Sequence, residues 1–217
     1  MLEDEPSISL SPKGPNRWKL VTPDHKNATL DDAAVIDAQL ANGDPWTLGV
    51  QERVRRAIGE AGARIAAARL LKVRARSSAE LRERLAGRYP REAVEKAVEG
   101  LVRAGAVDDA RLADQLAEQF GELRPHAREA VREKLERARL GAEMLEEALN
   151  THAASGGESD RALEAARGQV RRLRALNLTP EAMRRRLFGV LARRGFDAET
   201  AAEAVERVLG ASEDEFE

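Results

Sequence analysis

The chain has 217 residues, a formal net charge of −2 and no cysteine, and this length suffices for one large domain or two small ones. Without cysteine there can be no disulfide bonds, thiolate catalysis or cysteine-ligated metal sites, and the three histidines lack the spacing of metal ligands. No apolar run approaches a membrane span of about 18 residues, and the N-terminus does not resemble a signal peptide. We therefore expect a soluble, cytoplasmic protein that is neither a metal enzyme nor a redox enzyme and needs no cofactor.

Residues 1–48 differ in composition from the rest of the chain. They contain five of the eight prolines and both tryptophans, and they show no long periodic pattern. The short apolar run at residues 18–21 indicates a strand or a small hairpin, whereas the first dozen residues are predicted to be disordered. This segment is therefore predicted to be an irregular extension.

From about residue 50 to residue 210, apolar residues recur at steps of three and four. Leu163, Ala166, Val170 and Leu173, for example, form one stripe of a helix. This pattern predicts an all-helical body without strands. Capping signals and glycines divide it into nine helices, at about 52–75, 78–87, 91–104, 109–121, 126–138, 142–152, 159–176, 180–194 and 198–210.

The helix ends follow from specific residues. Ser77 with Glu80 three residues later forms a capping box, and Thr179 followed by a proline is typical of a helix N-terminus. Gly105 and Gly195 stand where left-handed C-caps are expected. The pair Asp108-Asp109 is best explained by a helix N-terminus, which favours negative charge, because no other metal ligand has matching spacing.

Three stretches of the helical body share one pattern of apolar spacing. It begins at Leu85, Leu135 and Leu191, which are 50 and 56 residues apart, and at Leu191 it includes Phe196 as the apolar partner of a Schellman motif at Gly195. The predicted fold is all-α, with tandem degenerate three-helix repeats that form an elongated, curved body. We divide the chain into an extension at 1–48, repeats at 49–105, 106–154 and 155–211, and an acidic tail at 212–217.

Charge is segregated along the chain although the total is near zero. Residues 167–194 contain nine arginines and one acid, and residues 53–76 contain seven arginines and one lysine against one acid. Residues 195–217 contain eight acids and one arginine. Guanidinium groups pair well with phosphates and carboxylates, so the two basic stretches are candidate partner surfaces. The alternative is that these arginines are solvated helix faces paired weakly with nearby acids.

Three blocks of the sequence resemble the RecX family of recombination regulators. Residues 71–85 resemble its L-x-x-R-x-R-S-x-x-E-L-x-x-x-L signature, residues 101–113 its block around two consecutive aspartates, and residues 187–197 its R-R-G-F block. The resemblance covers about residues 65–210 and implies a fold of tandem three-helix repeats. The chain departs from the family pattern at Ala106 and Leu112, where aromatic residues are usual, and at Arg139, where a glycine is usual.

The resemblance implies a regulator without enzymatic activity that binds the recombinase RecA and its filament on single-stranded DNA. Such binding would inhibit recombinase, ATPase and co-protease activities and so affect DNA repair and the SOS response. Contact with double-stranded DNA is a further possibility, and a monomer is expected. The arginines expected to bind the partner or nucleic acid are Arg74, Arg76, Arg82, Arg84, Arg167, Arg171, Arg174, Arg184, Arg185, Arg186, Arg193 and Arg194.

Two other functions remain open from the sequence. The helices at 78–87 and 91–104 could imitate a helix-turn-helix of a transcriptional repressor, but the second helix mixes acids with bases and is a poor recognition surface for a major groove. A helical-repeat scaffold that does not bind nucleic acid is the third reading.

Overall fold

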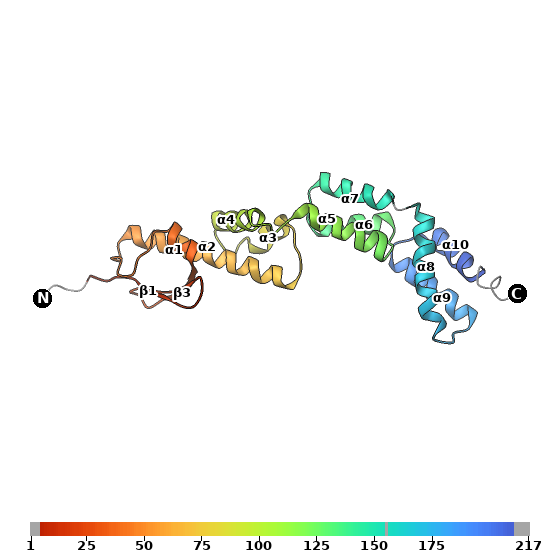
Figure 1. Ribbon diagram of the computed structural model, residues 1–217, viewed down its shortest axis with the longest axis horizontal. Helices are drawn as coiled ribbons and strands as arrows, with labels where there is room; N and C mark the ends of the chain where they lie inside the picture. Colours follow the sequence, from red (N-terminus) through yellow and green to blue (C-terminus); the bar gives the residue numbers. More distant parts are fainter. Residues whose placement is uncertain (1–4, 155, 211–217) are drawn as a thin grey trace. The chain divides into compact units, whose positions relative to one another are not determined.

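The computed structural model describes residues 5–154 and 156–210 (Figure 1). The chain divides into two compact units, Met1–Asp108 and Asp109–Glu217. The acidic tail predicted at 212–217 lies outside the described residues.

The first unit begins with a small antiparallel sheet. Strands β1 (Ser9–Pro12), β2 (Arg17–Val21) and β3 (Asn27–Asp31) lie side by side in sequence order. A short helix, α1 (Asp32–Asp37), follows directly, and its N-cap is Asp31, whose side chain accepts a hydrogen bond from the Ala34 amide at 2.9 Å. The predicted strand at 18–21 is confirmed by β2.

The expected disorder of the first dozen residues is wrong for Ser9–Pro12, which pairs with β2. The reason is that a few apolar residues in these short strands pack together. Ile8, Leu20 and Leu30 are each at most 1% exposed and belong to one hydrophobic cluster with Val50, Val54 and Ala57 of the helix that begins at Leu48. Segments of four or five residues are too short to show a period, so β1 and β3 were not apparent from the sequence.

The long helix α2 (Leu48–Val73) contributes buried residues to three hydrophobic clusters of the first unit. Val50, Val54 and Ala57 in its first half pack against the sheet. Ala67 in its second half packs with helices α3 (Ser78–Leu85) and α4 (Arg91–Arg103), and Val98 is the fully buried residue that α4 contributes. The extension and the first three-helix group therefore share one helix.

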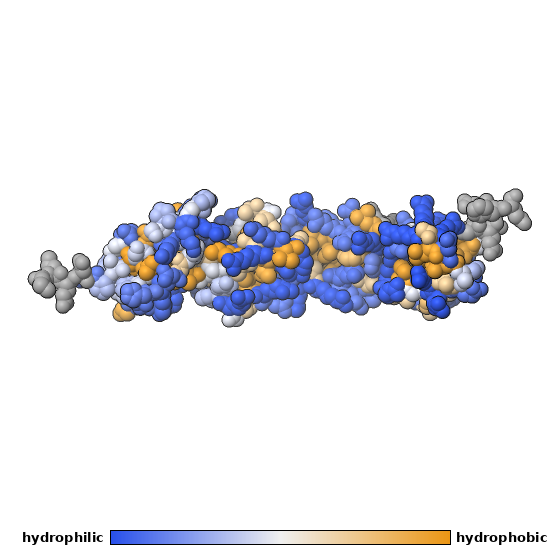
Figure 2. Space-filling model, turned by 90° about the horizontal axis from the view of Figure 1, so that it is seen from below, coloured by the Kyte–Doolittle hydropathy of each residue, from blue (hydrophilic) through white to orange (hydrophobic). Residues whose placement is uncertain are grey.

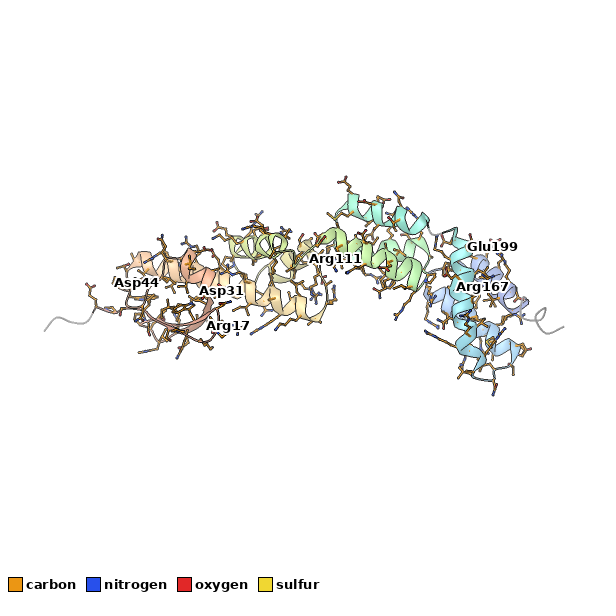
Figure 3. All side chains as sticks on the ribbon, viewed as in Figure 1. Arg17, Asp31, Asp44, Arg111, Arg167 and Glu199 are labelled. Atoms are coloured by element: carbon orange, nitrogen blue, oxygen red, sulfur yellow. The ribbon has the colours of Figure 1, made fainter. Side chains whose placement is uncertain are left out.

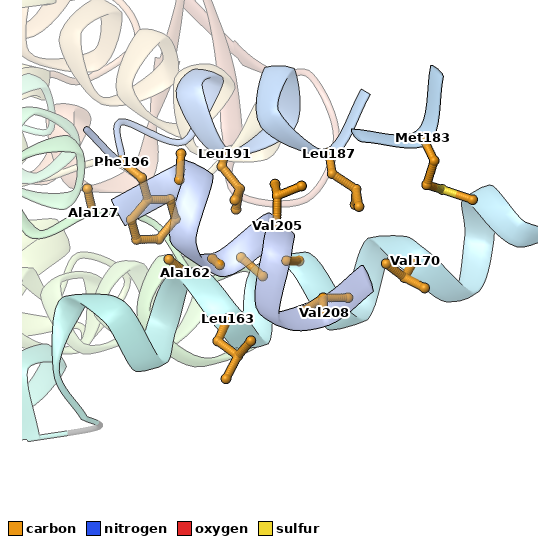
Figure 4. Packing of buried hydrophobic residues seen from close by; sticks show 14 residues of the cluster. Ala127, Ala162, Leu163, Val170, Met183, Leu187, Leu191, Phe196, Val205 and Val208 are labelled. Carbon is orange, nitrogen blue, oxygen red and sulfur yellow. The ribbon is translucent and has the colours of Figure 1, made fainter. Parts of the chain in front are cut away.

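The second unit consists of two three-helix groups. The first contains α5 (Asp109–Glu118), a π-helical turn η1 (Gln119–Leu123), α6 (Arg128–Arg137) and α7 (Ala142–Ala154). The second contains α8 (Glu158–Arg174), α9 (Pro180–Arg193) and α10 (Ala198–Gly210). Each group has its own hydrophobic cluster. In the last group, Leu187 and Leu191 of α9 face Val205 of α10 over α8 (Figure 4).

The nine predicted helices are confirmed with small shifts of their ends, and the all-α class is confirmed for the repeat region. Helix α1 was not predicted, and the predicted helix 109–121 is divided into α5 and η1. Helices α3 and α9 begin at the predicted caps, since the Ser77 and Thr179 side chains accept hydrogen bonds from amides three residues later. The repeat boundaries themselves remain our interpretation.

The turns that end the second helix of a group use left-handed backbone geometry. At Gly195, with a φ of 85°, the Phe196 amide donates to the Leu191 carbonyl at 3.3 Å and the Gly195 amide donates to the Ala192 carbonyl at 3.0 Å. These two bonds are those of the predicted Schellman motif. Arg139 takes a φ of 59° at the matching place in the preceding group. Arginine therefore replaces the usual glycine at position 139, and the backbone of the turn is still left-handed.

Candidate interaction surface

The signature residues at 71–85 form the junction between α2 and α3. Glu80 is 4% exposed, and its Oε1 accepts a hydrogen bond from Arg74 at 2.6 Å and one from Arg84 at 2.9 Å. Arg76 also donates to this oxygen, and its Nε donates to the Leu70 carbonyl at 3.2 Å. Burial opposes the charged form of Glu80, but the hydrogen bonds from Arg84 and Arg74 outweigh it and lower the pKa of the carboxyl.

This geometry separates the four arginines predicted for the first unit. Arg76 is 8% exposed and is held inside the junction, so it does not belong to a partner surface and we withdraw it from the predicted set. Arg74 and Arg84 have half-exposed side chains and share one carboxylate. Arg82 pairs with Glu95 of α4 at 2.8 Å. Three of the four arginines in the signature thus donate to the buried Glu80 carboxylate, so their spacing serves an internal ion cluster as well as the surface.

The arginines of α8 are solvent-exposed. Arg167, Arg171 and Arg174 lie at i, i+4 and i+7 of this helix and all three are exposed, as the sequence predicted. Arg167 is labelled on α8 in Figure 3. Within residues 5–154 and 156–210, Arg167 and Arg171 have no ion pair with an acid. Their positive charge is therefore available to a partner.

Helix α9 carries a second set of exposed arginines. Arg184 is held by Glu206 of α10 through two hydrogen bonds, Nε to Oε1 at 2.6 Å and Nη2 to Oε2 at 3.0 Å. Arg185 and Arg186 are exposed and, among the described residues, pair with no acid. The predicted three-arginine cluster thus contains one neutralised member and two available ones.

The last two predicted arginines differ from each other. Arg193 is exposed. Arg194 is half-buried, and its Nη1 donates to the Pro125 carbonyl at 3.4 Å. Burial, with the nearby guanidinium groups of Arg124 and Arg172, lowers the pKa of Arg194. Sequence reasoning did not select Arg124, which stands alone in its segment, or Arg172, which lies outside the i, i+4, i+7 stripe.

Other candidate chemistry is not supported by the described part of the chain. Helix α5 begins at Asp109, which confirms that Asp108-Asp109 lies at a helix N-terminus. Among the described residues, no cluster of three or more acids and histidines could hold a metal ion. No described helix has the length and apolar character of a membrane span. The face drawn in Figure 2 is mostly hydrophilic, with apolar patches between the charged side chains.

Three-helix groups that present exposed arginines define a helical-repeat protein with a cationic surface. Residues 63–101 match the family model of the first three-helix domain of RecX. A regulatory protein RecX of Mycobacterium avium is 33% identical over 153 residues, which cover 70% of this chain and 87% of the relative. A regulatory protein RecX of Chlorobaculum tepidum is 31% identical over 145 residues, covering 66% of this chain and 86% of the relative. The chain therefore belongs to the RecX family of regulatory proteins.

The fold agrees with that of a solved relative. A crystal structure of a regulatory protein RecX aligns with a TM-score of 0.59 and 19% identity, covering 90% of this chain and 96% of the other. The segment matched by the family model contains the second half of α2, with α3 and most of α4. The Glu80 ion cluster therefore lies in the part of the chain that carries the family match.

Proposed function

We propose that this protein binds RecA, and in particular the RecA filament on single-stranded DNA, and inhibits its recombinase, ATPase and co-protease activities. It would thereby restrain DNA repair by recombination and the SOS response. It would act in the cytoplasm as a monomer, without a cofactor or catalytic residue of its own. The proposal is supported by membership of a family of regulatory proteins and by the exposed arginines of α8 and α9.

The observation that carries the proposal is the excess of uncompensated guanidinium groups in the last three-helix group. Arg167, Arg171, Arg185 and Arg186 are exposed and have no ion pair within residues 5–154 and 156–210. Exposed arginines of this kind keep their full charge in solvent, and when they meet the phosphates of a nucleic acid they release the counterions bound there. They also form bidentate pairs with carboxylates of a protein partner. A nucleoprotein filament offers both groups.

The arginines of the first unit would have a smaller part. Arg74, Arg82 and Arg84 each have an acidic partner already, so a partner must compete with an existing ion pair. The same argument weighs against a helix-turn-helix repressor that reads DNA with α4, since Lys96 of that helix pairs with Glu60 at 2.8 Å. Specific recognition of a promoter would require those cations to leave their partners.

The experiment is a titration of the protein into RecA, single-stranded DNA and ATP, with the rate of ATP hydrolysis as the readout. We expect hydrolysis to fall as the protein approaches saturation. The variant R185E/R186E should require a higher concentration for the same inhibition and should show a weaker salt dependence. The matched variant E181Q/E199Q changes two exposed acids of α9 and α10 and should inhibit like the wild type.

Two results would overturn the proposal. Unchanged hydrolysis at excess protein, together with specific binding to a promoter duplex, would favour the repressor. Unchanged hydrolysis without binding to any nucleic acid would favour a helical scaffold. If hydrolysis falls but R185E/R186E behaves like the wild type, inhibition does not depend on the arginine surface of α9.

A further inference from the structure

The second unit contains a polar pocket of about 270 Å³ whose wall carries three arginines. Arg124 follows the π-helical turn η1, Arg172 lies on the last turn of α8, and Arg194 is the C-cap of α9. Gln169 and Glu164 of α8 also line it. Three segments that are far apart in the sequence therefore bring cationic groups to one cavity.

Backbone contacts hold this pocket in place. The Ala127 amide donates to the Arg194 carbonyl at 3.0 Å, which joins the segment after η1 to the end of α9. The two parts approach so closely at Gly195 that a Cβ atom there would lie 2.8 Å from the Cβ of Ala130. The π-turn itself is closed by the Arg124 amide, which donates to the Gln119 carbonyl at 3.0 Å. π-Helical turns are rare in proteins, and those that occur are often found at functional sites.

The charge of the pocket is not balanced within the described residues. Arg124, Arg172 and Arg194 pair with no acid in residues 5–154 and 156–210, and Glu164 is the one described acid that lines the cavity. Burial lowers the pKa of Arg194, and the nearby positive charges of Arg124 and Arg172 lower it further, so the pocket wall disfavours the charge on Arg194. An anion in the cavity would offset these positive charges.

We propose that this pocket binds a single phosphate group. The chemistry of the wall favours phosphate over a carboxylate, because a tetrahedral phosphate offers oxygens in several directions to converging guanidinium groups, whereas a carboxylate offers two oxygens in one plane. Gly168 of α8 lines the pocket, and the space beside it is empty, since an added Cβ would meet no atom within 4 Å. The phosphate reaches the arginines without displacing a side chain there.

Two sources could supply this phosphate, the backbone of a single-stranded nucleic acid or free phosphate in solution. The DNA backbone as a source rests on the proposed function, since a regulator that contacts a filament on single-stranded DNA would meet such phosphates. The presence of the site itself does not rest on RecA. The two sources are therefore tested separately and without RecA.

The test uses the full chain and the variant R124Q/R172Q, in which two exposed arginines lose their charge. The control variant R137Q/R207Q removes the same charge from two other exposed arginines of this unit, which pair with Glu133 and Glu203. Fluorescence anisotropy measures binding to a labelled oligonucleotide at several salt concentrations, and the line width of the ³¹P signal measures binding of inorganic phosphate. Circular dichroism establishes that each variant is folded.

For a backbone phosphate, we expect R124Q/R172Q to weaken oligonucleotide binding about tenfold, the effect of losing a charge-assisted hydrogen bond. The salt slope should fall by about 0.7, the value for one phosphate of a single strand. The control should bind like the wild type. For free phosphate, broadening of the ³¹P signal should disappear in R124Q/R172Q while the oligonucleotide binding stays unchanged.

The proposal is overturned if R124Q/R172Q and R137Q/R207Q are alike in both measurements, because a general loss of charge then explains any change. It is also overturned if neither measurement differs from the wild type. Neither result bears on the inhibition of RecA, which is measured by ATP hydrolysis. Conversely, the phosphate site stands even if the protein fails to inhibit RecA, provided that the wild type broadens the ³¹P signal and R124Q/R172Q does not.

Discussion

The buried ion cluster at the junction of α2 and α3 predicts a large effect of the substitution E80Q. Glutamine keeps the shape of the side chain and removes its charge. In the wild type, Oε1 of Glu80 accepts hydrogen bonds from Arg74, Arg76 and Arg84. The variant leaves the guanidinium of Arg76, whose side chain is 7% exposed, without a compensating charge. A buried charge without a partner is costly because its hydration has been lost.

The magnitude follows from the burial of each partner. Breaking a buried ion pair by removing one member costs about 3–5 kcal/mol. Arg74 and Arg84 have half-exposed side chains, and each such pair contributes about 0–1 kcal/mol. Because the glutamine oxygen still accepts a hydrogen bond, we expect a loss near the lower limit, about 3 kcal/mol of the free energy of unfolding.

Urea denaturation measures this loss. For a slope of about 2 kcal/mol per molar urea, the midpoint should fall by about 1.5 M. Trp18 and Trp46 are the two tryptophans of the chain and both pack against the sheet cluster of the first unit, so their fluorescence follows this unit. The control E99Q changes an exposed acid of α4 and should leave the midpoint unchanged. A loss below 1 kcal/mol for E80Q would refute the account of the junction.

The same cluster predicts a dependence on pH. The pKa of Glu80 in the folded state lies below its ordinary value of 4.5, because the arginines stabilise the carboxylate more than burial disfavours it. Its contribution to stability is therefore complete above pH 4.5 and is lost as the pH falls through the folded pKa. The difference in unfolding free energy between the wild type and E80Q should be full at pH 7 and should shrink below pH 4.5. A difference that is constant from pH 7 to pH 3 would contradict this assignment.

Two further substitutions test the packing and the turns, with thermal or urea denaturation as the measurement. G62A places a Cβ atom 2.7 Å from Cε1 of Tyr89 and should lower the free energy of unfolding by about 1–2 kcal/mol. At Gly100 an added Cβ meets nothing within 4 Å, so G100A should raise this free energy by up to about 1 kcal/mol. Equal shifts for the two variants would refute the close approach of α2 to Tyr89. R139G should raise stability by about 0.5–1 kcal/mol, since a left-handed backbone strains arginine and not glycine; a loss of stability would show that the arginine side chain contributes more than the strain costs.

The helices were predictable from the sequence because each part of their signal is local. Apolar residues repeat over ten or more positions, and the caps at Ser77 and Thr179 act on amides three residues away. The Schellman motif at Gly195 is likewise contained within six residues. Of the N-terminal sheet only β2 was predicted, because the sheet's core depends on contacts such as those of Ile8 and Leu20 with α2, which cannot be inferred from runs of four or five residues.

The candidate surface was predictable in composition but not in geometry. The excess of arginine in residues 167–194 was apparent from the sequence and places exposed charge on α8 and α9. The sequence did not reveal that Arg76 is buried or that Arg184 is neutralised by Glu206, which is 22 residues away. The pocket at Arg194 depends on the turn after α5, and no local pattern connects the two segments.

The central claim is that the RecA filament is the target of this protein, and its most direct test is a comparison of affinities at one salt concentration. Labelled protein is titrated with the filament on single-stranded DNA, with the same DNA alone and with RecA alone, and anisotropy is measured. We predict at least tenfold tighter binding to the filament than to either component, because only the filament offers carboxylates and phosphates together. Equal affinity for naked DNA and for the filament would contradict the account.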